Sequence, residues 1–147
     1  MRVLVTGFGP FLDNPVNPSD RLARALDGRC RAGVTFTART PLPVEHRRAA
    51  EIALDAARAA RADAIVAFGL AAGTARIRLE SLGRNRLSSP HPDGAGDVRA
   101  GRAVVPGGPG RLAATLPARP IAAALRAAGI RVEHSSDAGG YVCNDLF

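Results

Sequence analysis

The chain has 147 residues, which is enough for one domain with a buried core. Hydrophobic residues make up 46% of it and aromatic residues only 4%, so we expect a globular core built from Ala, Val, Leu and Ile. No segment approaches the roughly 20 apolar residues that span a bilayer, and Gly7–Pro10 interrupts the apolar start. We therefore expect no signal peptide and no membrane partner, and we place the protein in the cytoplasm.

The net charge of +7 comes from 20 basic and 13 acidic residues, and every basic residue is arginine. These arginines are scattered, and the longest basic run is Arg47-Arg48. A nucleic-acid surface usually shows clustered charge or a recognisable module, so we expect a solvated basic surface and no nucleic-acid partner. The two cysteines, Cys30 and Cys143, are expected to be free, with Cys30 structural or incidental.

Strand and helix patterns alternate along the chain. Asn17 is a candidate helix cap with Pro18 at the first helical position, and Pro41 and Pro43 are expected to end the second strand. The order predicts an α/β fold with three α/β/α layers and a twisted, mostly parallel sheet, in one domain over 1–147. The predicted strands are 2–6, 34–40, 64–68, 75–82 and 130–136; the predicted helices are 18–26, 45–61, 120–128 and one beginning near residue 143; loops cover 7–15 and 83–111.

The loop after the first strand, Thr6-Gly7-Phe8-Gly9-Pro10-Phe11-Leu12, invites comparison with the dinucleotide-binding pattern G-x-G-x-x-G. Leu12 occupies the third glycine position and Pro10 lies inside the turn, so we expect no dinucleotide cofactor. A tight strand-to-helix loop is the plain alternative. Because ligands bind at the carboxyl ends of parallel strands, Phe8 and Phe11 could also wall an apolar pocket.

Cys143 follows the Gly139-Gly140 turn at the start of the last predicted helix. A thiol at a helix N-terminus is favoured as thiolate, and the free N–H groups there could hold an oxyanion. The plain alternative is a small buried hydrophobic residue.

Two further sets of side chains have a plain and a functional interpretation. Glu80 shares a strand face with Arg76 and Arg78, so it forms a cross-strand ion pair or orients a catalytic base. His46, His91 and His134 have no metal-ligand spacing, and we expect no metal.

Three motifs together resemble the pyroglutamyl peptidase I (pyrrolidone-carboxylate peptidase) family of cysteine peptidases. They are Thr6-Gly7-Phe8-Gly9-Pro10-Phe11 with Asn17-Pro18-Ser19, the series Gly69, Glu80, Asn85, and Ala138-Gly139-Gly140-Tyr141-Val142-Cys143-Asn144. Gly107-Gly108-Pro109 and Leu116-Pro117 fit between the last two, so the resemblance is collinear over nearly the whole chain.

The resemblance implies removal of N-terminal pyroglutamate from peptides by a Cys–His–Glu triad without a cofactor. Cys143 would attack the acyl carbonyl, and Glu80 would orient the histidine that activates it. Asn17 would hydrogen-bond the lactam, and Leu70 would offer its backbone carbonyl. A flat, uncharged lactam suits an apolar slot that cannot solvate the charges of a free glutamate. The positions that would line the slot are Phe8, Phe11, Val44, Tyr141 and Val142.

The chain also departs from the family pattern. Arg78, Ser81 and Gly83 replace residues common around the glutamate, and Pro90 stands where the family often has an arginine near the oxyanion, with Arg84 or Arg86 as substitutes. The family histidine lies beyond the cysteine, on a strand that the 147 residues do not reach, so we expect a chain without its C-terminal strand and helix, inactive alone and self-associating. The alternatives are a degenerate homologue that only binds a ligand or partner, and an unrelated nucleotide-binding domain.

Overall fold

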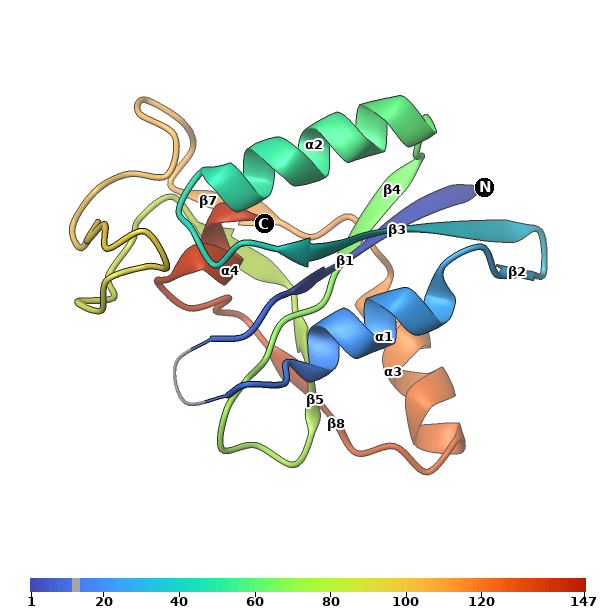
Figure 1. The fold of residues 1–147 in the computed structure, drawn as a ribbon. Coiled ribbons are helices and arrows are strands. Elements are labelled where there is room, and N and C mark those ends of the chain that lie inside the picture. The colour runs from blue at the N-terminus through green and yellow to red at the C-terminus, as the bar shows by residue number, and fades with distance from the viewer. Residues whose placement is uncertain (12–13) are drawn as a thin grey trace. The chain divides into compact units, whose positions relative to one another are not determined.

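The computed structural model describes residues 1–11 and 14–147, so the loop predicted over 7–15 includes two residues, Leu12 and Asp13, that lie outside the described part. Two compact units emerge from the contacts (Figure 1). The first comprises Met1–Leu70, His91–Val98 and Leu146; the second comprises Ala71–Pro90, Arg99–Asp145 and Phe147. The expectation of a single domain over 1–147 stays a prediction, and each unit is described by itself.

The first unit is built on a four-stranded sheet of order β2-β3-β1-β4, in which β1 pairs in parallel with both β3 and β4. Helices α1 and α2 lie on opposite faces of this sheet (Figure 1), so the unit has three layers and the predicted α/β class is confirmed. The elements are β1 (Arg2–Phe8), α1 (Pro18–Leu26), β2 (Cys30–Arg31), β3 (Val34–Leu42), α2 (Arg48–Ala60) and β4 (Ala64–Ala67).

The core of this unit follows from the two-residue period of β1. Val3 and Val5 point to one face and pack with Ala23 of α1, while Leu4 and Thr6 are buried on the other face. A strand buried on both faces reads as a continuous apolar run, which is why β1 was predictable.

Helix α1 begins as predicted, because the Asn17 side chain caps it and Pro18 occupies its first turn. Three other predicted boundaries are wrong. Strand β1 continues to Phe8, two residues beyond its predicted end. Strand β3 continues through Pro41 to Leu42. A proline is tolerated there because β2 pairs only with Val34 and Thr35, and because the pairing of β3 with β1 is irregular between Thr6 and Phe8. Helix α2 begins three residues later than predicted, after Arg47, whose φ is 63°.

The second unit contains two separate two-stranded pairings, β5 with β8 in parallel and β6 with β7 antiparallel. The single strand predicted over 75–82 is interrupted at Ser81, and the loop predicted over 83–111 is wrong at both ends. A three-residue strand is too short to show a period in the sequence. The elements are β5 (Ile77–Glu80), β6 (Leu82–Arg84), β7 (Arg111–Ala113), α3 (Ala118–Ala127), β8 (Val132–Ser135) and α4 (Val142–Asp145).

None of the helices in the described part is long and apolar enough to cross a membrane.

We predict that Gly7→Ala destabilises the protein strongly, whereas Gly9→Ala is close to neutral. A Cβ on Gly7 would overlap the Ser19 carbonyl and lie 2.7 Å from the Asp20 nitrogen, and backbone atoms cannot move aside. A Cβ on Gly9 meets its nearest atom at 3.5 Å, an ordinary contact. Urea unfolding should show a loss of roughly 2 kcal/mol or more for Gly7→Ala and under about 1 kcal/mol for Gly9→Ala. Equal effects would contradict the close approach of β1 to α1.

Candidate active site

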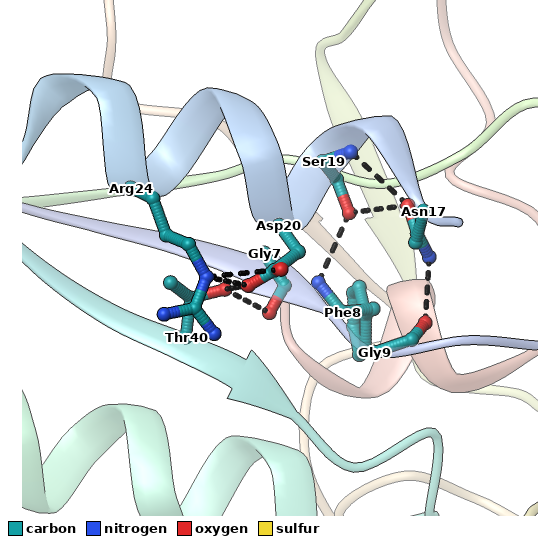
Figure 2. Close-up of polar contacts among 8 residues, drawn as sticks. All are labelled: Gly7, Phe8, Gly9, Asn17, Ser19, Asp20, Arg24 and Thr40. Carbon is teal, nitrogen blue, oxygen red and sulfur yellow. Dashed lines mark hydrogen bonds and ion pairs between the residues drawn. The ribbon is translucent and has the colours of Figure 1, made fainter. Parts of the chain in front are cut away.

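The carboxyl end of β1 is fixed by a hydrogen-bonded cluster around Asn17 (Figure 2). Asn17 Nδ2 donates to the Gly9 carbonyl at 2.9 Å, and its Oδ1 accepts from the Ser19 nitrogen and hydroxyl at 3.1 and 2.7 Å. The Ser19 hydroxyl in turn accepts the Phe8 N–H at 3.0 Å. Two buried polar side chains thus satisfy the loop backbone beyond the sheet, and among the described residues Asn17 Nδ2 donates to the Gly9 carbonyl alone.

A second cluster in Figure 2 ties α1 to β3. Asp20 accepts from Arg24 Nε at 3.0 Å and from the Thr40 hydroxyl at 2.7 Å. The hydrogen bond from Arg24, and then the one from Thr40, lower the pKa of the Asp20 carboxyl below its usual value. Desolvation opposes this shift but is the smaller effect. The ends of β1, β3 and α1 therefore meet in a fixed arrangement.

The five pocket residues predicted in the first unit follow the carboxyl ends of adjacent parallel strands. Phe8 ends β1 and is 4% exposed, Val44 lies two residues beyond β3, and Leu70 lies three residues beyond β4. Phe11 and Asn17 belong to the loop after β1, and Asn17 is 5% exposed. In open α/β sheets this edge is where ligands bind.

Residues 91–98 continue the same edge next to Val44. The Val44 carbonyl accepts the Gly94 N–H at 2.7 Å, and the Asp93 carboxylate accepts the His46 N–H at 2.7 Å. Burial would raise the pKa of Asp93, but the backbone N–H groups of His46, Asp97 and Ala95 together lower it. Sequence reasoning missed Asp93, because nothing in the spacing links it to a residue 47 positions earlier.

In the second unit, Glu80 lies on a polar face of the β5–β8 pair. Arg78 Nε is 3.5 Å from Glu80 Oε1 and 3.3 Å from Glu133 Oε1. Arg76 is 3.5 Å from Glu133 Oε2. The predicted cross-strand ion pair of Glu80 is wrong, because Glu80 pairs with Arg78 of its own strand. The ion pairs across the strands are those of Arg78 and Arg76 with Glu133.

The second oxygen of Glu80 differs from the first. Oε2 is buried and has no hydrogen-bond partner among the described residues. A buried carboxylate oxygen without a donor is costly, so this atom marks a place where a donor is expected. His134 cannot supply it from its own position, because it pairs with Leu79 and therefore points to the opposite face from Glu80 and Ser135.

The turn that carries Cys143 is fastened to the segment from Leu82 to Ser89. The Gly140 carbonyl accepts the N–H groups of Ser88 and Ser89, both at 3.0 Å. The Asn144 side chain, 3% exposed, accepts the Arg84 N–H at 2.8 Å and donates to the Arg84 carbonyl. A Cβ at Gly140 would lie 2.7 Å from the Ser88 nitrogen, so this glycine is required for the close approach.

The electrostatics of Cys143 differ from the sequence expectation. The expected preference for thiolate is wrong: desolvation, and then the charge of Glu80, raise the pKa of Cys143, while its own backbone N–H lowers it only in part. Cys143 is exposed as a residue, and desolvation of its thiol nevertheless comes first among the causes that raise its pKa. Helix α4 has only four residues, so its dipole is too small to outweigh the effects that raise the pKa of Cys143. The pKa of Cys143 therefore depends on the charge of Glu80.

The other predicted residues of this unit are placed as follows. Val142 is 1% exposed, and the Tyr141 carbonyl accepts the Asn144 N–H at 2.9 Å. Arg84, suggested as a substitute near the oxyanion, has its guanidinium 3.0 Å from Asp137 Oδ2. Cys30 and Cys143 are both free, and no group of three metal-ligating side chains occurs in the described part of the chain.

Comparison with known proteins adds a consistent result. All 147 residues match the family model described as pyroglutamyl peptidase. The chain is 41% identical over 147 residues to the pyrrolidone-carboxylate peptidase of Gloeobacter violaceus, covering 100% of this chain and 71% of that protein. It is 38% identical over 145 residues to pyrrolidone-carboxylate peptidase 1 of Ralstonia nicotianae, covering 99% and 67%.

Solved structures agree. The crystal structure of Bacillus amyloliquefaciens pyroglutamyl peptidase I matches with a TM-score of 0.95 at 29% identity, over 99% of this chain and 70% of that one. The pyrrolidone carboxyl peptidase of Pyrococcus furiosus matches with a TM-score of 0.94 at 34% identity, with the same coverage.

We predict that Asn144→Leu destabilises the protein by about 2 kcal/mol or more, because the part-buried Arg84 N–H and carbonyl would lose the buried amide that pairs with them. Cys143→Ser, one residue away, should change stability by under about 1 kcal/mol. Urea unfolding of both variants measures this difference. If Asn144→Leu were as stable as Cys143→Ser, the side-chain amide would not be what fastens the turn.

We also predict that Glu80→Gln makes Cys143 easier to alkylate. Removing the Glu80 charge lowers the raised pKa of Cys143, so the rate of its reaction with iodoacetamide should rise at a lower pH than in the unmodified protein. Peptide mass spectrometry follows Cys143 and, as an internal reference, Cys30, whose rate should not change. An unchanged Cys143 profile would mean that the Glu80 charge does not reach the thiol.

Proposed function

Because the chain belongs to the pyroglutamyl peptidase family, we propose that it removes N-terminal pyroglutamate from peptides, with Cys143 as the nucleophile and Glu80 as the residue that orients a histidine base. The observation that carries this proposal is that the charge of Glu80 helps to raise the pKa of Cys143, while Glu80 Oε2 is buried and has no donor among the described residues. A free thiol beside such a carboxylate lacks one component of a triad, the base between them.

In the proposed reaction the histidine takes the Cys143 proton while Sγ attacks the carbonyl carbon of the pyroglutamyl residue. The C–N bond then breaks, and the leaving amine takes the proton from the imidazolium. Water hydrolyses the resulting thioester, which releases 5-oxoproline and restores the thiol. A thiol whose pKa is raised needs this base, since little thiolate forms spontaneously near neutral pH.

The residues at the carboxyl edge of the first unit are proposed to recognise the lactam, and the family motif adds Tyr141 and Val142 as proposed substrate-binding positions. Phe8, Phe11 and Val44 would supply apolar surface. Asn17 would donate its remaining Nδ2 hydrogen to the lactam carbonyl, because its Oδ1 already accepts two bonds from Ser19. The Leu70 carbonyl would accept the lactam N–H. One donor and one acceptor in an apolar surround favour a neutral ring over a charged N-terminus.

The base is not His134, whose side chain lies on the opposite strand face from Glu80, and neither His46 nor His91 matches the family motif. We therefore propose that the 147-residue chain by itself turns over substrate poorly, because loss of a triad base typically costs several orders of magnitude. We further propose that peptides are the only partners apart from copies of the chain itself, and that the protein acts in the cytoplasm.

The test is release of aminomethylcoumarin from pyroglutamyl-aminomethylcoumarin, measured with the 147-residue chain and with the complete product of its gene. We expect release by the complete product that Cys143→Ser abolishes and Glu80→Gln reduces at least tenfold, with no release from the glutamyl analogue. Absence of Cys143-dependent release in both forms would overturn the peptidase. Binding of 5-oxoproline without release would instead favour a ligand-binding homologue.

A further inference from the structure

Arg78 contacts more groups than a cross-strand ion pair requires. Its guanidinium lies 3.5 Å from Glu80 Oε1 and 3.3 Å from Glu133 Oε1, and Nη2 donates to the Ser135 hydroxyl at 2.9 Å. Arg76, on the same strand face, contacts Glu133 alone, at 3.5 Å. The two arginines therefore differ in that Arg78 contacts Glu80 and Arg76 does not.

Ser135 connects Arg78 to the segment that leads to the nucleophile. The Ser135 side chain is engaged with the backbone of Asp137, from which it accepts the N–H at 3.2 Å, with the Asp137 carbonyl 3.1 Å away. Ser135 is 9% exposed. The guanidinium of Arg78 is thus anchored on β8 and fixed in direction, so that it contacts one oxygen of Glu80 and leaves the other.

We propose that Arg78 is a positioning residue for Glu80: it holds Oε1, balances the charge of the carboxylate next to Glu133, and leaves Oε2 oriented to accept a hydrogen bond from the catalytic base. This inference rests on the proposed function, in which Glu80 orients that base. A carboxylate that rotates freely would present either oxygen and would orient an imidazole less well.

The charge of Glu80 is felt at Cys143, where it helps to raise the pKa of the thiol. Arg78 fixes the position of that carboxylate, so its loss would leave Glu80 free to turn toward Sγ and would strengthen the negative field there. The charged or titratable groups of the elements concerned are Arg78 and Glu80 on β5, Arg76 directly before it, Glu133 and His134 on β8, Cys143 and Asp145 on α4, and the Arg84–Asp137 pair. Of the two arginines on the polar face, only Arg78 contacts Glu80.

The experiment measures the pH profile of Cys143 alkylation by iodoacetamide in the 147-residue chain, with Cys30 as internal reference. Arg78→Ala should move the Cys143 profile about half a pH unit higher, which is about a threefold slower reaction on the rising limb. Arg78→Lys keeps the charge, so its Cys143 profile should lie close to that of the unmodified protein. Arg76→Ala removes the same charge from the same face and should leave the profile unchanged.

A double-mutant cycle decides whether Arg78 acts through Glu80. In a Glu80→Gln background, Arg78→Ala should have no further effect on the profile. An equal shift in both backgrounds, or the same shift with Arg76→Ala, would overturn the proposal in favour of a general charge effect. Should Arg78→Ala unfold by circular dichroism, Arg78→Gln and Arg78→Lys provide the same comparison with a polar side chain retained.

The alkylation readout does not require peptide hydrolysis, so the two proposals fail separately. Coupling between Arg78 and Glu80 without coumarin release from the complete gene product would leave the positioning role and overturn the peptidase. Coumarin release by that product without coupling between Arg78 and Glu80 would support the peptidase and overturn the positioning role. If both proposals hold, Arg78→Ala in the complete gene product should lower kcat more than it raises KM, since the base and not the lactam is displaced.

Discussion

Loop backbone groups that no strand or helix pairs must find other hydrogen-bond partners, and side-chain amides meet this constraint beside several residues of the candidate site. Asn17 binds the backbone of Gly9 and Ser19 beside Phe8, and Asn144 binds that of Arg84 beside Cys143. Asn85 closes the long loop in the same way, donating to the Val105 and Gly108 carbonyls. An amide suits this task because it donates and accepts within one rigid plane.

This constraint explains which parts of the site the sequence predicts. Asn17 caps a helix that starts at the next residue, so local pattern was sufficient to place it and α1. Asn144 holds Arg84, 60 positions earlier, and the pairing depends on β6, a three-residue strand without a readable period. The polar face of β5 was predictable from its two-residue spacing, but its partner Glu133 was not, since pairing with β8 joins residues 55 positions apart.

The charge state of Cys143 could not be predicted from its position in the chain, because two opposing effects act on it. A turn rich in free N–H groups favours thiolate, whereas enclosure by protein and a nearby carboxylate favour the neutral thiol. The N–H groups of the turn can be inferred from the sequence. The enclosure and the nearby carboxylate cannot, because they arise from residues brought together by folding. The outcome is a thiol whose pKa is raised, so the proposed reaction at Cys143 calls for a base.

A neutral nucleophile is consistent with a neutral substrate. On the polar face of β5 and β8 the positive charges of Arg76 and Arg78 balance the negative charges of Glu80 and Glu133. With the thiol protonated, the proposed catalytic groups carry little net charge until the base acts. An uncharged lactam would then bind without facing an unbalanced ion, and charge would develop only as Sγ attacks, which is when electrostatic stabilisation accelerates a reaction.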